Sequence, residues 1–96
     1  FDDSENKLNF SILDVNGEIL LISQFTLHAS VKKGNRPSYI KAADSKKAKQ
    51  MYDQTIREFE TLLKRKISTG KFGANMEVSL VNNGPVTITI DTKKKE

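Results

Sequence analysis

One long amphipathic stretch near the middle of this 96-residue chain most constrains what it can fold into. Apolar side chains recur there at spacings of three and four residues, the period of an α-helix: Ala48, Tyr52, Ile56, Phe59 and Leu63. Met51 and Leu62 widen this stripe, and Lys64–Lys66 gather at its end, where a helix dipole favours cations. Asp44 or Ser45 can cap the first turn. The sequence therefore predicts one long helix whose apolar face must be covered by other elements.

Two strand-like segments precede this helix. Asn9–Val15 and Glu18–Leu27 flank Asn16-Gly17, a dipeptide typical of tight hairpin turns, so we expect the two segments to pair. Ile19–Ile22 is a continuous apolar run, which indicates a strand buried on both faces. Lys32–Ser38, with Gly34 and Pro37, reads as a loop.

Two further strands are expected after the helix. Ser68–Met76 reads as a glycine-punctuated loop. Alternating apolar residues then lie on either side of Gly84-Pro85: Met76, Val78 and Leu80 before it, and Val86, Ile88 and Ile90 after it. The order strand, strand, helix, strand, strand predicts an α/β fold, in which a mixed sheet packs against at least one long helix.

Length and composition indicate one soluble globular domain. A domain of this size is expected to bury roughly 60 to 70% of its extended-chain surface, which gives a modest core. There is no cysteine and no apolar run long enough to span a membrane. Because the chain begins with Phe1 in the stretch FDDSENK, we expect it to be a piece of a longer protein.

The net charge of +4 is distributed in clusters of basic residues. These clusters are Lys32, Lys33 and Arg36; Lys46, Lys47 and Lys49; Lys64, Arg65 and Lys66; and Lys93, Lys94 and Lys95. They are compatible with binding of a polyanion, and equally with a solvated surface that ends in a frayed tail. We expect the basic tail 93–96 to be disordered.

The inventory of side chains makes conventional side-chain catalysis difficult. Ser23 and Thr26, in the stretch SQFTL, are the hydroxyls that attract attention, and His28 is the only histidine that could act as their base. No nucleophile elbow, metal-ligand spacing or phosphate-binding glycine loop is present. Backbone N–H groups at the end of a strand can instead stabilise an oxyanion.

The hexapeptide NNGPVT, Asn82–Thr87, allows two interpretations. Gly84-Pro85 can be a tight turn between strands, because proline fixes φ and glycine opens conformations closed to other residues. It can also be a rigid edge without side chains that tests the shape of a ligand by steric clash. An X-Pro bond is also the place where a cis peptide costs little.

Four motifs in this order resemble one known family. They are SQFTL at Ser23–Leu27, KKGNRPS at Lys32–Ser38, GKFGANM at Gly70–Met76 and NNGPVT at Asn82–Thr87. The chain looks like a D-aminoacyl-tRNA deacylase of the bacterial and eukaryotic type, from Phe1 to about Thr92. The resemblance implies that residues 1–92 form the C-terminal two-thirds of a single domain. The N-terminal strands and helix that the family normally carries would be missing from this chain.

The resemblance implies a site at the interface of a homodimer. Ser23, Gln24, Phe25 and Thr26 would form one wall, and the backbone N–H groups of Phe25 and Thr26 would be the oxyanion donors. Five further residues would bind the substrate: Phe72 and Gly73 near the terminal adenosine, Met76 in the pocket, and Gly84 with Pro85, in cis, from the other subunit.

The implied activity is hydrolysis of the ester of D-aminoacyl-tRNA, and of glycyl-tRNA, in the cytoplasm, without a cofactor or metal. The partner would be aminoacyl-tRNA, and L-aminoacyl esters would be rejected by the Gly84-Pro85 edge. Two alternatives remain open. One is a non-catalytic RNA-binding or dimerisation fragment. The other is a related deacylase that edits L-alanyl-tRNA, against which Ser23 and Phe25 argue.

Overall fold

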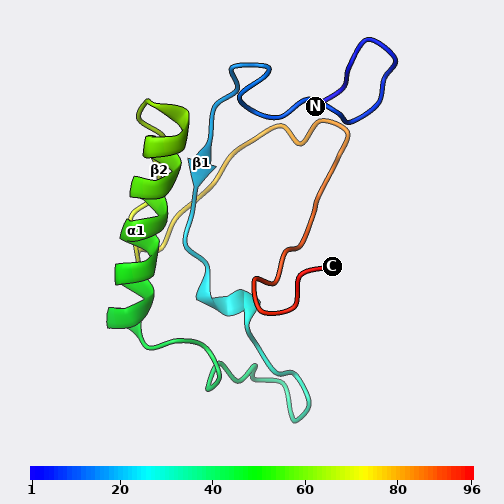
Figure 1. Ribbon diagram of the computed structural model, residues 1–96. Helices are drawn as coiled ribbons and strands as arrows, with labels where there is room; N and C mark the ends of the chain where they lie inside the picture. The colour runs from blue at the N-terminus through cyan, green and yellow to red at the C-terminus, as the bar shows by residue number, and fades with distance from the viewer.

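The computed structural model describes all 96 residues and contains one long helix and three short elements (Figure 1). In chain order they are β1 (Leu20–Leu21), the 3₁₀ turn η1 (Phe25–Leu27), α1 (Ser45–Leu63) and β2 (Ser68–Thr69). β1 and β2 form a two-stranded parallel sheet in which Leu20 is opposite Ser68 and Leu21 is opposite Thr69. The connection between these two strands runs through η1 and α1, so the single long helix lies beside a small sheet (Figure 1).

The predicted helix is confirmed, including its start. Asp44 has extended backbone angles, and its carboxylate accepts a hydrogen bond from the Lys47 N–H at 3.0 Å, which caps the first turn. The helix ends at Lys64, which adopts the left-handed conformation and donates its N–H to the Glu60 carbonyl. The five residues of the apolar stripe are half-buried, whereas Met51 and Leu62 remain 58% and 66% exposed.

The helix is held against the sheet by a few long-range contacts. The Tyr52 hydroxyl donates to the Leu21 carbonyl at 2.8 Å, across 31 residues of chain. The carboxylate of Glu60 accepts from the Ile67 N–H at 3.1 Å, just before β2. These two hydrogen bonds position α1 along its axis relative to β1 and β2.

The predicted hairpin around Asn16-Gly17 is wrong. Asn16 does adopt a left-handed conformation, with φ at 53°, but its flanks do not pair. The Ser11 N–H donates to the Asp14 carboxylate and the Asp14 N–H donates to the Ser11 hydroxyl, so residues 12–16 form turns. Such local side-chain bonds compete with a strand ladder. The prediction that the apolar run is buried on both faces is also wrong, because Leu20 is 55% exposed.

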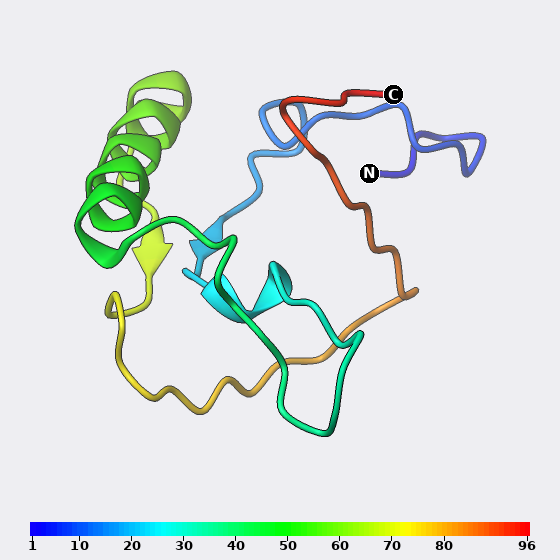
Figure 2. The same ribbon diagram turned by 90° about the horizontal axis from the view of Figure 1, so that it is seen from below.

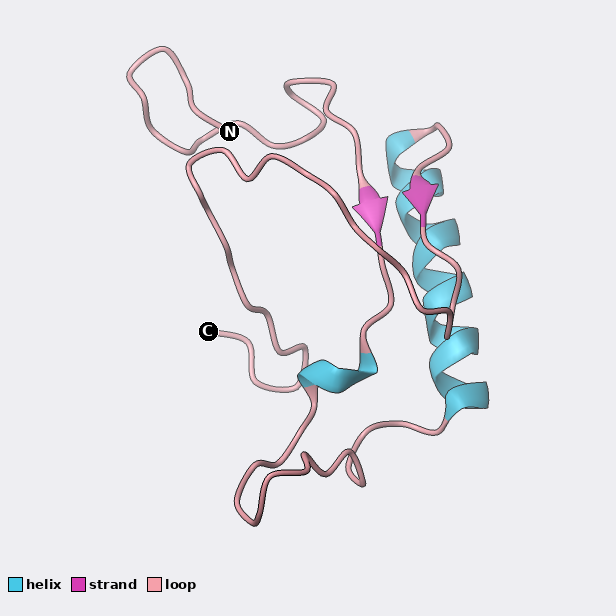
Figure 3. Ribbon diagram, turned by 180° about the vertical axis from the view of Figure 1, so that it is seen from behind, coloured by secondary structure: helices cyan, strands magenta, loops and turns pink.

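The two strands predicted around Gly84-Pro85 are also absent. No backbone hydrogen bond is made by any residue from 75 to 90, and this segment runs as a wide arc away from α1 (Figure 3). A strand exists only when a neighbouring chain pairs with it, and no part of residues 1–96 lies beside this arc as a partner. The preceding stretch is not wholly a loop either, because Ser68–Thr69 forms β2.

The expectation of a modest core is wrong for these residues. No residue is buried, and the accessible surface is 9255 Å², whereas a folded monomer of this mass, 10.8 kDa, exposes roughly 5,500 Å². The radius of gyration is 16.2 Å, compared with about 12.5 Å for a compact domain of this length. The view from below shows that most of the chain outside α1 runs as long loops spread away from the helix (Figure 2). None of the helices in the structure combines the length and apolar character that crossing a membrane requires.

Candidate active site

The stretch SQFTL leaves the sheet and turns sharply, and this turn exposes two backbone donors. Gln24 is extended, with φ at −151°, and the next three residues form η1, closed by the His28 N–H donating to the Phe25 carbonyl at 3.1 Å. The N–H groups of Phe25 and Thr26 donate no hydrogen bond within the chain. The first N–H groups of a helical turn have no partner in the turn itself. Two adjacent donors without an acceptor therefore lie in this turn, and an oxyanion site is built from such donors.

The side chains around these donors offer no activated nucleophile. The Thr26 hydroxyl accepts a short hydrogen bond from the Gln24 side-chain amide. His28 is exposed and makes no side-chain hydrogen bond to Thr26, and the half-buried Ser23 hydroxyl has no hydrogen-bond partner. Because a hydroxyl nucleophile needs an adjacent base, the structure does not support the pair of Thr26 and His28 as a catalytic dyad.

Two of the predicted pocket residues lie beside the end of β1. The Phe72 ring packs at 5.8 Å from the ring of Tyr52, the residue whose hydroxyl reaches the Leu21 carbonyl. A Cβ placed on Gly70 would lie 2.7 Å from the Met76 sulfur and 3.6 Å from Cδ1 of Ile22. Met76 and Ile22 thus both lie close to Gly70. Met76 is therefore near the residue that precedes Ser23, and Phe72 lies beside Tyr52, which is hydrogen-bonded to Leu21.

Gly73, also predicted in the site, completes the turn between these two residues. Its φ of 72° falls in the left-handed region, and the Ala74 N–H donates to the Lys71 carbonyl at 3.1 Å across it.

The turn η1 is also tied to the loop that follows it. The Phe25 ring meets the Tyr39 ring edge to face, with centroids 5.2 Å apart and an interplanar angle of 77°. Ser30 and Ser38 exchange two backbone hydrogen bonds, of 2.8 and 2.9 Å, which close the loop between them. This contact between Phe25 and Tyr39 was not predicted from the sequence, and an aromatic residue directly after the KKGNRPS motif was its only signal.

Gly84 and Pro85 are not brought together with η1 in the single chain. Both residues are exposed, their peptide bond is cis, and Gly84 has φ at 121°. In Figure 1 the light-orange stretch that carries them passes the upper part of the molecule, whereas η1 lies at its lower part. No hydrogen bond joins the two segments.

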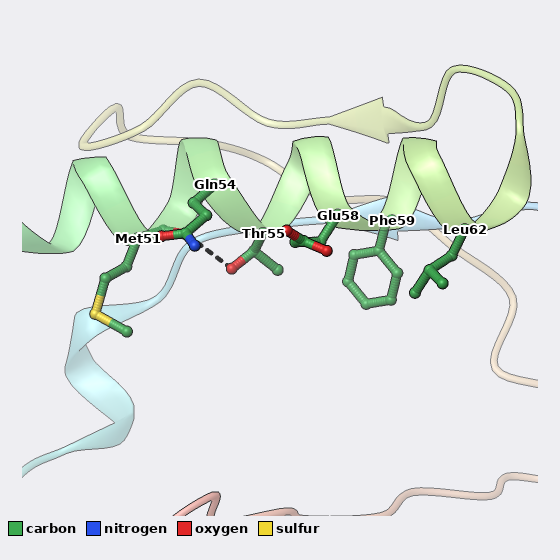
Figure 4. A pocket seen from close by; sticks show the side chains of 6 residues that line it. All are labelled: Met51, Gln54, Thr55, Glu58, Phe59 and Leu62. Carbon is green, nitrogen blue, oxygen red and sulfur yellow. Dashed lines mark hydrogen bonds between the residues drawn. The ribbon is translucent and has the colours of Figure 1, made fainter.

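A shallow hollow on the surface of α1 contains none of the predicted site residues. It measures about 310 Å³ and is lined from α1 alone, by Met51, Gln54, Thr55, Glu58, Phe59 and Leu62 (Figure 4). No group of three or more His, Asp or Glu side chains is arranged to hold a metal ion.

Fold and site together define an α/β protein whose candidate site presents backbone donors and shape in place of an ionisable catalytic pair. The chain belongs to the D-Tyr-tRNA(Tyr) deacylase family, whose sequence profile matches residues 1–91.

Curated relatives align over the whole chain. A D-aminoacyl-tRNA deacylase of Flavobacterium psychrophilum is 54% identical over 96 residues, one of Phocaeicola vulgatus is 57% identical, and one of Akkermansia muciniphila is 49% identical. In each comparison the chain is covered completely but spans only 64% of the relative's length.

A solved structure shares the same backbone trace. It is titled c-Myc DNA Unwinding Element Binding Protein, and it superposes with a TM-score of 0.84 at 37% sequence identity. The alignment covers 96% of this chain and 62% of the other. The α/β fold class predicted from the sequence, that of the deacylase family without a further portion, is therefore confirmed, although several individual strands were wrong.

Proposed function

We propose that the protein carrying residues 1–96 hydrolyses the ester bond between a D-amino acid, or glycine, and the 3′ end of tRNA. The observation that carries this proposal is the pair of free N–H groups at Phe25 and Thr26, in a chain that belongs to the deacylase family. Acyl transfer needs stabilisation of the charge that develops on the carbonyl oxygen, and backbone donors without another acceptor can supply it.

In the proposed reaction, a water oxygen attacks the ester carbonyl carbon, assisted by the 2′-hydroxyl of the terminal ribose. The bond from that carbon to the 3′ oxygen breaks, the 3′ oxygen takes up a proton, and a free amino acid leaves. Phe25 and Thr26 stabilise the oxyanion, while Ser23 and Gln24 form the adjoining wall. Phe72, Gly73 and Met76 position the terminal adenosine and the amino acid. This assignment is supported by the packing of Phe72 and Met76 beside the end of β1.

The proposed selectivity needs a second copy of the chain. Gly84 and Pro85 of one subunit would enter the site of the other and occupy the space of an L side chain, so that only D-amino acids and glycine fit. The exposure of both residues, and their separation from η1 within one chain, support a homodimer in which the edge reaches a partner.

The remaining parts of the proposal concern context. Residues 1–92 would form the C-terminal two-thirds of one deacylase domain, residues 93–96 a basic tail, and the protein would act in the cytoplasm. No cofactor enters the proposed chemistry. The neighbour titled a DNA-unwinding-element binding protein is compatible with a fold that binds nucleic acid.

The deciding experiment compares D-tyrosyl-tRNA with L-tyrosyl-tRNA as substrates for the purified protein. We expect rapid release of tyrosine from the D ester and none above background from the L ester. Release from L-alanyl-tRNA but not from D-tyrosyl-tRNA would favour the L-alanine-editing alternative. Binding of tRNA without any hydrolysis would favour the non-catalytic alternative.

A further inference from the structure

Formal charge is distributed very unevenly along this chain. Residues 28–49, here called the basic segment, contain seven lysines and arginines and one aspartate, a net charge of +6. The seven are Lys32, Lys33, Arg36, Lys41, Lys46, Lys47 and Lys49. The whole chain has sixteen basic and twelve acidic residues, so the other 74 residues hold nine basic and eleven acidic ones and are net negative. The net positive charge of the chain thus comes from this one segment.

The basic segment is not neutralised by the rest of the chain. All seven side chains are exposed, and only Lys49 has an ion pair, with Asp53 at 2.8 Å. Two basic residues directly after α1 differ, because the Arg65 guanidinium donates to the Asn16 side chain and Lys66 lies 3.7 Å from Glu60. A surface that served only solubility would interleave both signs of charge. Here six cations stand without a partner.

Two of these cations are placed where the helix disfavours them. Lys46 and Lys47 lie in the first turn of α1, which contains no acidic residue. The N-terminus of a helix carries partial positive charge, so lysines there are unfavourable for the helix itself. The Asp44 cap offsets this only in part, through one bond to the Lys47 N–H. A residue that breaks a local rule without a compensating contact indicates a role outside the fold.

The basic segment is attached directly to the candidate site. It begins one residue after η1, and the ring contact between Phe25 and Tyr39 holds its loop against that turn. The two bonds between Ser30 and Ser38 project Lys32, Lys33 and Arg36 at the loop tip. Figures 1 and 3 show η1, this loop and the N-terminal end of α1 at the same end of the molecule.

We propose that the basic segment is a docking surface for the phosphates of an RNA helix, and that it binds the double-stranded stem adjoining the 3′ end of tRNA. This inference rests on the proposed function, since it takes the 3′ end to be in the site at η1. A stem entering that site carries its phosphates past the end of the molecule where these cations lie. The lysines and arginine would contact phosphates and not bases, so binding would not depend on the RNA sequence. Because such contacts release counterions, the affinity should fall steeply as the salt concentration rises.

The test measures the affinity of deacylated tRNA for the protein across a series of salt concentrations. The first variant combines Lys32→Gln, Lys33→Gln and Arg36→Gln in the loop, and the second combines Lys46→Gln and Lys47→Gln in α1. We expect the loop variant to bind about tenfold or more weakly and to lower the slope of log affinity against log salt by roughly two units. The helix variant should lower it by about one unit.

A matched control changes the net charge by the same amount elsewhere. Lys93→Gln, Lys94→Gln and Lys95→Gln remove three charges from the C-terminal tail, which lies far from the loop in the view from below (Figure 2). This control should keep the slope of the unsubstituted protein. Circular dichroism verifies that each variant keeps its helix, and because all eight lysines and arginines are exposed, their replacement removes no buried contact.

Three results would overturn the inference. The first is a loop variant and a helix variant that both keep the salt slope. The second is a tail control that lowers it as much as the loop variant does. The third is a loop variant that keeps its tRNA affinity but no longer binds vesicles containing anionic lipid, which would assign the surface to a membrane. The proposed function is judged separately, by release of amino acid from D-tyrosyl-tRNA by the unsubstituted protein.

Discussion

At Phe25, a comparison of two substitutions isolates the contribution of one backbone N–H. Gln24, which precedes it, is extended, the conformation required before proline, and Phe25 is the first residue of η1, where proline is tolerated. Phe25→Pro deletes the N–H and the ring, whereas Phe25→Ala deletes only the ring. If the N–H stabilises an oxyanion, the proline variant should show a kcat about 10² to 10³ lower than that of the alanine variant on D-tyrosyl-tRNA.

The comparison has a second control in Thr26→Ala, which removes the hydroxyl and keeps the donor. We expect this variant to retain substantial activity. Equal rates for the proline and alanine variants at Phe25, with Thr26→Ala inactive but folded, would contradict the assignment and restore the hydroxyl as nucleophile.

At Gly84, the addition of a single Cβ atom tests the proposed selectivity for D-aminoacyl esters. Its φ of 121° lies where residues with a side chain are strained, and a Cβ there would lie 3.1 Å from the Val86 nitrogen. Gly84→Ala must therefore reshape the proposed edge, and we expect lower activity on D-tyrosyl-tRNA together with a smaller ratio of D to L hydrolysis.

Gly34→Ala is the matched control for that variant, because Gly34 also has positive φ, at 65°, but an added Cβ meets nothing within 4 Å. It should leave the D to L ratio unchanged. An unaltered ratio in Gly84→Ala as well would remove the edge from the account of selectivity.

Among the elements, the N-terminal turn depends on one carboxylate. Asp3 accepts from the Glu5 N–H at 2.8 Å, the Lys7 N–H at 3.0 Å and the Asn9 amide at 2.8 Å. The bond from Lys7, followed by those from Asn9 and Glu5, holds the pKa of Asp3 below its ordinary value.

The pH dependence of this turn follows from the direction of that shift. The turn is fully stabilised above the ordinary Asp pKa of about 3.9 and loses this contribution as the pH falls through the lowered value. Amide resonances of Glu5 and Lys7 should therefore move toward random-coil positions in strong acid. Asp3→Asn, which does not titrate, should remove this pH dependence, and resonances of the unsubstituted protein that stay fixed would show that the carboxylate does not hold the turn.

The elements also show how far sequence reasoning reaches. The helix was predicted with its start, because its signals are local: an apolar stripe with a period near 3.6 and a cap at Asp44. The strands were predicted only in part: β1 lies within the predicted strand segment Glu18–Leu27, but the expected pairings were wrong, because a strand depends on a neighbour that sequence pattern does not supply. Residues 75–90 alternate apolar and polar side chains and yet have no hydrogen-bonded partner in this chain.

In the candidate site, too, the local features could be predicted from the sequence and the long-range contacts could not. The motif SQFTL located the strand end and its two backbone donors, because they lie next to one another in sequence. The approach of Met76 and Ile22 to Gly70, and the packing of Phe25 against Tyr39, join residues that no local motif connects. No local pattern encodes such contacts, and they became visible only in three dimensions.

At the scale of the whole molecule, the dominant fact is the surface that residues 1–96 leave exposed. The excess over a folded monomer of this mass is roughly 3,700 Å². Large apolar side chains contribute to it along the arc after β2, where Val81, Ile88 and Ile90 are 93%, 75% and 71% exposed. Yet the same trace superposes on a solved structure of which it covers 62%, so it is a conformation that a longer chain stabilises.

Residues 1–96 expressed alone should therefore lack a cooperative unfolding transition. The apolar surface that normally offsets the loss of chain entropy is not buried, and a single helix of 19 residues is marginal in water without packing against other elements. Circular dichroism during a thermal ramp should show a shallow, nearly linear loss of a weak helical signal. The full-length relative from Flavobacterium psychrophilum, measured in parallel, should unfold in one sharp step.

A sharp transition in residues 1–96 would contradict this expectation, and its dependence on concentration would identify what covers the exposed surface. A midpoint that rises with concentration would mean that second copies bury the apolar arc. A midpoint independent of concentration would mean that the chain closes on itself into a shape more compact than its 16.2 Å radius of gyration. In that case Gly84-Pro85 could approach η1 of the same chain, and the edge proposed for the site would no longer need a partner subunit.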